Sequence, residues 1–123
     1  MLQAMVAAAL LLWGWTLPLH VTFRDAREEP AYAGVTAMAW VEELNTAPEC
    51  EIWTGNRFYY QPVERQLSTI THEIGHCLGL DHVAYPSIMR DPSYWLTPQE
   101  ADLVALRQLH PLQRRSFASV AAN

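Results

Sequence analysis

Eleven residues near the middle of the chain restrict its fold more than any other segment. Residues 72–82 read HEIGHCLGLDH and follow the pattern HExxHxxGxxH. Residues four positions apart lie on one face of an α-helix, so His72 and His76 can direct two imidazoles to one ion. Gly79 can adopt the left-handed conformation that ends a helix, and His82 can then return to the same ion. The segment predicts a helix, a sharp turn and a metal site.

The residue types in this pattern indicate which metal and which chemistry to expect. Three neutral nitrogen ligands leave one tetrahedral position open, which is typical of a catalytic zinc rather than a structural one. Glu73 follows the first ligand and can reach a water molecule on the metal without being a ligand itself. We therefore expect one catalytic Zn²⁺ ion, with Glu73 placed beside the water that it would bind.

Composition limits the other functional classes. The chain has 123 residues, half of them hydrophobic and 11% aromatic, which is typical of one globular domain with a modest core. Its net charge is −5, it contains no lysine, and it has no basic patch. We therefore expect no nucleic-acid partner, and we expect a monomer.

The first 19 residues allow two interpretations. The run from Ala4 to Trp13 is apolar, like the core of a signal peptide or a membrane anchor. However, no Lys or Arg precedes it, and no small-x-small cleavage site follows before Pro18. Gly14 and Pro18 also interrupt it too early for a stable membrane span. We favour the second interpretation, a buried domain helix over residues 2–15.

The remaining pattern predicts a mixture of helices and strands. Thr97-Pro98-Gln99-Glu100 combines a capping threonine, a proline at the first helical position and a glutamate three residues after the cap, so it predicts the start of a last helix. The residues from Arg24 to Pro30 are charged and predict a loop. The fold class that follows is α+β. The other expected elements are strands at Leu19–Phe23, Val35–Val41 and Cys50–Trp53, and a main helix from about Val63 to Leu78.

With these elements in place, the chain resembles the metzincin zinc metallopeptidases and, among them, the matrixins. The signature HExxHxxGxxH is matched at all its fixed positions, and Ser87-Ile88-Met89 follows at the distance of a matrixin Met-turn. Trp13, Pro18-Leu19 and Val21 are similar to the family pattern around the first helix. The resemblance implies a zincin-like fold, in which a small twisted mixed sheet packs on the N-terminal and active-site helices. A C-terminal helix would follow the Met-turn, with Met89 as the apolar floor beneath the zinc.

The resemblance also implies hydrolysis of a peptide or protein substrate, with Glu73 as general base and then general acid, and it implies where that substrate binds. The segment from Gly34 to Val41 is similar to the edge strand to which substrate pairs antiparallel, and residues 85–95 would form a wall of the pocket. Tyr94 would contact the developing oxyanion or serve as an aromatic of that wall. Asp102, near the start of the last helix, would brace the floor of the site. The implied substrate-binding residues are Val35, Thr36, Ala37, Met38, Ala39, Trp40 and Tyr94.

Several features depart from the family. The family's first strand, which precedes the first helix, has no counterpart, so we expect either a minimal domain over residues 1–111 or an incomplete gene product. Residues 112–123 are expected to form a flexible tail. The loop that carries further metal sites in the family is missing, so we expect no calcium and no second zinc. His20 and His110 stand alone and are expected at the surface or at an edge. We expect a secreted or extracellular protein, although no clear cleavable signal peptide is present.

Two questions stay open at this level. Cys50 and Cys77 form either a disulfide between the third strand and the active-site helix or two buried thiols, because the sequence gives no distance between the sulfurs. The function also has rivals. A gluzincin would use a downstream glutamate in place of His82, whereas a non-catalytic or truncated zinc-binding module would retain the fold without turnover.

Overall fold

The computed structural model describes residues 1–32, 34–43, 48–91 and 95–110. In this part of the chain, four α-helices and three strands form a mixed α+β fold, as predicted. The segment from Arg24 to Pro30, expected to be a loop, instead contains the end of the first strand and a short 3-10 helix, Ala26–Glu28. A second 3-10 helix, Pro30–Tyr32, begins at the last residue of that segment. The elements are α1 (Leu2–Trp13), β1 (His20–Asp25), β2 (Ala37–Glu43), β3 (Pro48–Thr54), α2 (Asn56–Tyr60), α3 (Val63–Cys77) and α4 (Glu100–Leu109).

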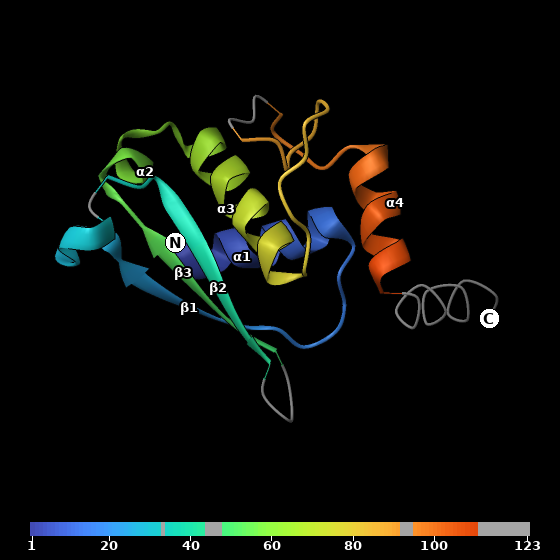
Figure 1. Cartoon of the computed structure of the whole chain (residues 1–123), viewed down its shortest axis with the longest axis horizontal. Coiled ribbons are helices and arrows are strands. Elements are labelled where there is room, and N and C mark those ends of the chain that lie inside the picture. Colours follow the sequence, from blue (N-terminus) through green and yellow to red (C-terminus); the bar gives the residue numbers. More distant parts are fainter. Residues whose placement is uncertain (33, 44–47, 92–94, 111–123) are drawn as a thin grey trace.

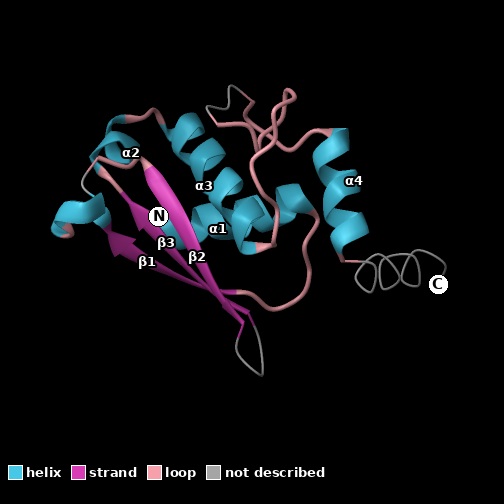
Figure 2. Ribbon diagram, viewed as in Figure 1, coloured by secondary structure: helices cyan, strands magenta, loops and turns pink. Residues whose placement is uncertain are grey.

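The described strands form one mixed sheet in the order β1-β3-β2. The central strand β3 runs parallel to β1 and antiparallel to β2, so β2 forms an edge of the sheet. Figure 1 shows the sheet on one side of the molecule, with α1 and α3 packed beside it and α4 at the opposite end. The predicted small mixed sheet is therefore confirmed, and its edge strand lies next to the helix that carries the histidines (Figure 2).

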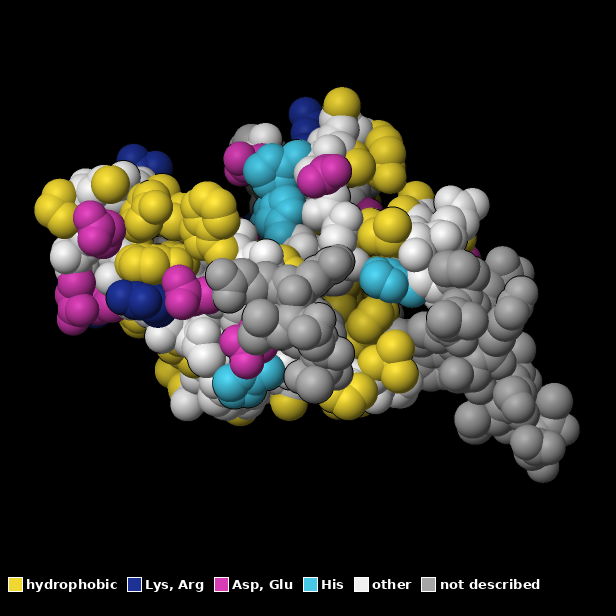
Figure 3. Space-filling view, turned by 60° about the horizontal axis from the view of Figure 1, so that its bottom comes forward, with side chains coloured by type: hydrophobic (Ala, Val, Ile, Leu, Met, Phe, Trp, Pro, Cys, Tyr) yellow, Lys and Arg dark blue, Asp and Glu magenta, His cyan; other side chains and the backbone are white. Residues whose placement is uncertain are grey.

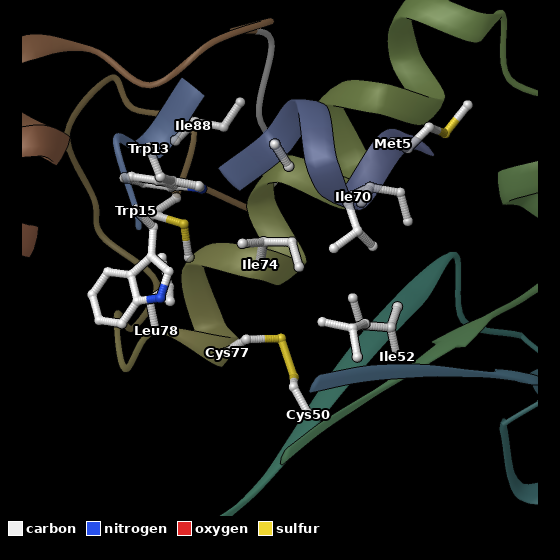
Figure 4. Packing of buried hydrophobic residues seen from close by; sticks show 14 of the residues in the cluster. Met5, Trp13, Trp15, Cys50, Ile52, Ile70, Ile74, Cys77, Leu78 and Ile88 are labelled. Carbon is white, nitrogen blue, oxygen red and sulfur yellow. A yellow bond between two sulfur atoms is a disulfide. The ribbon is translucent and has the colours of Figure 1, made fainter. Parts of the chain in front are cut away.

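The core lies between the sheet and the two long helices. From α1, the buried residues Met5, Val6, Ala9 and Trp13 recur at helical spacing and therefore form one face. They pack with Ile70 and Ile74 of α3 and with Ile52 of β3 (Figure 4). The N-terminal segment is thus part of the domain core, as we favoured. None of the helices in the described part of the chain is long and apolar enough to cross a membrane.

A disulfide joins the centre of the sheet to the end of the histidine-bearing helix. Cys50 of β3 and Cys77 of α3 are bonded, with their Cα atoms 5.6 Å apart. Both side chains are buried, at 1% and 5% exposure (Figure 4). Of the two alternatives for the cysteines, the structure has the disulfide.

Some predicted boundaries are wrong. The last helix begins at Glu100, not beside Thr97, because Gln99 and Asp102 make the capping box. The Gln99 backbone N–H donates to Asp102 Oδ2 at 2.8 Å, and the Gln99 side chain accepts from the Asp102 backbone. The second strand begins at Ala37, so Val35 and Thr36 precede it. The sequence did not predict α2, whose five residues are too few to show a helical period.

The two isolated histidines behave differently. His20 is exposed on the edge strand β1, as predicted, with its Nδ1 3.7 Å from a Glu49 carboxylate oxygen. His110 is half-buried at the end of α4, and its Nε2–H donates to the Leu78 carbonyl at 2.6 Å. His110 thus lies at an edge, within the predicted surface or edge position, but it does not stand alone, because its ring contacts the end of α3. The predicted tail, residues 112–123, lies outside the described residues.

Candidate metal centre

Three histidine side chains converge at the end of α3. His72 and His76 lie one turn apart on the helix, and their Nε2 atoms are 3.1 Å apart. Gly79 has a φ of +99°, which turns the chain back so that His82 Nε2 lies 3.2 Å from His72 Nε2. A tetrahedral zinc with Zn–N bonds of about 2.0–2.1 Å places its ligand nitrogens about 3.3 Å apart. The cluster therefore has the spacing that such an ion requires, with one ligand atom available from each histidine.

Backbone carbonyls set the tautomers of the two helical histidines. His72 Nδ1–H donates to the Ile88 carbonyl at 2.6 Å, and His76 Nδ1–H donates to the Leu80 carbonyl at 2.7 Å. In a neutral imidazole, a proton on Nδ1 leaves a lone pair on Nε2, so two Nε2 lone pairs face each other. Metal-binding histidines usually donate the N–H of their other ring nitrogen to an acceptor in this way, which leaves the Nε2 lone pairs to bind a metal ion.

Burial keeps these two rings neutral. Desolvation lowers the pKa of His72 to about 4, although the bond to Ile88 opposes the shift. Desolvation also lowers the pKa of His76, against the effect of its bond to Leu80. Both rings are therefore unprotonated at pH 7, which is the form that binds a metal.

Glu73 lies beside the histidines in a buried position. Its side chain is 6% exposed, and its Oε2 atom has no hydrogen-bond partner among the described residues. Burial, with a smaller contribution from the negative charge of Asp91, raises the pKa of Glu73 to about 7. A carboxyl group with a pKa near the working pH is suited to accept and return a proton. The unpartnered oxygen also leaves an acceptor for a group brought to the site.

These residues share a pocket of about 550 Å³ with the edge strand. Thr36, Ala37, Met38 and Ala39 form one wall, and the histidine face of α3 forms another. Histidine side chains reach the surface together, next to acidic side chains, in the space-filling view (Figure 3). The pocket therefore connects the histidine cluster to the first residues of β2.

Two other predicted substrate residues, Trp40 and Val35, are not among the residues that line this pocket. Trp40 is 58% exposed and pairs with Glu51, one residue along from the Ala39–Ile52 pair that faces the helices. Because side chains alternate along a strand, Trp40 lies on the opposite face of the sheet. Val35 precedes the strand and is not a lining residue either. Tyr94 lies outside the described residues.

The turn below the histidines is braced from α4. Met89 is 2% exposed, and its Sδ occupies the space that a Cβ on Gly75 would need. Asp102, also 2% exposed, accepts hydrogen bonds from Ser87 Oγ and from the Ile88 N–H, the latter at 3.4 Å. Ser87 Oγ in turn accepts from the Met89 N–H at 2.8 Å. Met89 thus packs against the helix turn between the two ligands, and Asp102 holds the segment that carries it.

Sequence reasoning missed part of the site. The carbonyls of Ile88 and Leu80 are backbone groups, so no residue type marks them. The far end of the pocket did have a signal, because its residues continue the helical face of the histidines at spacings of three, four and seven. Counted back from His72, these helical residues are Thr69, Ser68 and Arg65. Gln61, which precedes the helix, and Arg90 and Asp91 of the loop also line the pocket.

The described residues define an α+β protein with a cluster of three histidines that could hold a metal and a buried glutamate beside it. No family model, curated protein or solved structure matches the chain.

Proposed function

We propose that this protein is a zinc-dependent endopeptidase of the matrixin-like metzincin type. The observation that carries the proposal is the convergence of three histidine Nε2 atoms beside the buried carboxyl of Glu73. His72, His76 and His82 would hold the ion. When bound, Zn²⁺ supplies Lewis-acid polarisation of a carbonyl group and lowers the pKa of water.

The proton chemistry belongs to Glu73. Its carboxylate would accept a proton from the attacking water and then deliver it to the leaving amine. A pKa of about 7 supports both roles, since the group is then partly ionised near neutral pH. Its burial also keeps bulk water from competing for the same proton.

The edge strand supports a peptide as substrate. Among the described strands, β2 pairs only with β3, and the first residues of β2 line the pocket. An extended peptide would add to this free edge by backbone hydrogen bonds, with alternate side chains directed into the pocket. The backbone of Ala37 to Ala39 would then hold the scissile bond near the histidines.

Two further observations support the matrixin-like assignment. Met89 lies against the turn between His72 and His76, as the resemblance implies for a Met-turn. Asp102 braces that turn from α4, again as the resemblance implies. The Cys50–Cys77 disulfide supports a secreted protein, because disulfides persist in oxidising compartments.

The test is cleavage of a mixed peptide library by the zinc-loaded protein. We expect cleavage that a chelator abolishes and that zinc restores. Glu73→Gln should retain zinc while turnover falls by about 10²–10⁴-fold, since a general base contributes an effect of that size. Glu64→Gln is the matched control, because Glu64 is exposed in the first turn of the same helix.

Two outcomes would count against the proposal. Substantial cleavage by Glu73→Gln would remove the general-base assignment. Zinc binding by the unmodified protein without any cleavage would favour a non-catalytic zinc-binding module instead.

A further inference from the structure

One side chain of α1 contacts the backbone of the histidine-bearing helix. Trp13 is 2% exposed, and its indole Nε1–H donates to the Thr71 carbonyl at 2.8 Å, a bond that is itself buried. That carbonyl belongs to the peptide group that joins Thr71 to His72. The indole therefore holds the peptide plane directly before the first ligand.

The same ring also meets the residue before the second ligand. A Cβ on Gly75 would lie 2.9 Å from Trp13 Cζ2, so the ring approaches the helix backbone at a place where only glycine fits. Met89 Sδ also lies close to the same point. Gly75 precedes His76, so Trp13 touches α3 at the two positions that immediately precede the helical ligands.

From these two contacts we infer that Trp13 is a positioning residue of the metal centre. It acts through the backbone, since it fixes the direction in which His72 and His76 leave the helix and hence the separation of their Nε2 atoms. The inference rests on the proposed metal site and deepens it, because it makes the first helix a part of that site. Removing the indole N–H should loosen the ligand geometry and weaken metal binding.

The chain contains a matched control two residues away. Trp15 is also buried, at 9% exposure, and its ring packs edge-on against His110 with centroids 4.8 Å apart. Its Nε1 atom has no hydrogen-bond partner among the described residues. Trp15→Phe therefore removes an indole N–H without removing a bond to α3, whereas Trp13→Phe removes both.

The experiment measures metal binding and coordination geometry in the full chain. Affinity for Zn²⁺ is measured by competition with a chromophoric chelator, and geometry by the visible spectrum of the Co²⁺-loaded protein, well below the melting temperature of each variant. Trp13→Phe should bind Zn²⁺ about 10-fold or more weakly, as expected for a partner that orients metal ligands, and its Co²⁺ bands should change in intensity. Trp15→Phe should leave affinity within about twofold and the spectrum unchanged.

A second variant at position 13 keeps the test possible if Trp13→Phe does not fold. 3-Benzothienylalanine at position 13 retains the bicyclic shape but has no N–H, so it decides the case if Trp13→Phe does not fold. Unchanged affinity and an unchanged Co²⁺ spectrum in a folded variant at position 13 would overturn the inference. If the unmodified protein binds neither ion at one per chain, the inference and the proposed metal site fall together. If it binds metal but cleaves no peptide, only the peptidase proposal fails.

Discussion

At the scale of single residues, the burial of Glu73 disfavours the folded state whenever its carboxyl is ionised. Its carboxyl is buried without a hydrogen-bond partner for Oε2 among the described residues, and its pKa is raised to about 7 from a usual value of 4.5. The folded state therefore binds this proton more tightly than the unfolded state does. The stability that follows is present below pH 4.5 and is lost as the pH rises to about 7. A buried carboxyl with a raised pKa is a candidate for proton transfer.

We therefore expect Glu73→Gln to stabilise the metal-free protein at alkaline pH. At pH 8 the free energy of unfolding should rise by an amount on the order of 1–3 kcal/mol, because the substitution removes a buried charge. At pH 4 the gain should disappear, since the native carboxyl is then protonated. Urea denaturation with a chelator present measures both values. A gain of equal size at both pH values would show that burial of the charge is not its cause.

At the scale of elements, α3 depends on its attachment to β3. The helix ends at Cys77, one residue after a ligand, and the disulfide to Cys50 ties that end to the central strand. His76 Nδ1 also donates to Leu80, just beyond the helix end. Unwinding of the last helical turn would therefore disturb His76 directly.

Removal of the disulfide should destabilise the domain. The bond closes a loop between cysteines 27 residues apart, and the chain-entropy estimate for a loop of that length is about 3–4 kcal/mol. The paired substitution Cys50→Ala and Cys77→Ala should lower the free energy of unfolding by that amount in urea denaturation. Reductant should destabilise the unmodified protein and leave the paired variant unaffected. If reductant destabilised both equally, the loss would have another origin.

The predicted helix boundaries agree with the structure where the local pattern has one interpretation and differ where it has two. The bounds of α3 agree with the sequence to within one residue, because Ile70 and Ile74 mark its core face by local periodicity. The start of α4 was predicted two residues too early, because Thr97 and Gln99 are each followed three residues later by an acidic residue and only the Gln99–Asp102 pair forms the capping box. Asp102 also accepts from Ser87, 15 residues away, and a local pattern does not include that contact.

At the scale of the whole molecule, metal binding and folding should be coupled. The ligands come from α3 and from the chain beyond Gly79, and the acceptor that holds His72 comes from Ile88. The site therefore exists only when these segments are packed together, so a bound ion stabilises the fold.

Zinc should accordingly raise the free energy of unfolding. At a free concentration a thousandfold above the dissociation constant, the increase should be about 4 kcal/mol, and thermal melting in zinc and in chelator measures it. His82→Ala should lose most of the increase, whereas His20→Ala should retain it because His20 lies on the distant edge strand β1. An equal response in the two variants would place the ion elsewhere.

Some features of this protein follow from its local sequence, and others follow from packing between distant segments. The sequence alone determined the three histidines, the glutamate beside them and the turn at Gly79, because helical period and glycine conformation act over a few residues. The tertiary structure decided which carbonyls orient the histidines, that the cysteines are bonded, and that Trp40 turns away from the pocket. It also brought Trp13 to the backbone before each helical ligand. These features depend on contacts between residues far apart in the chain, which no local pattern encodes.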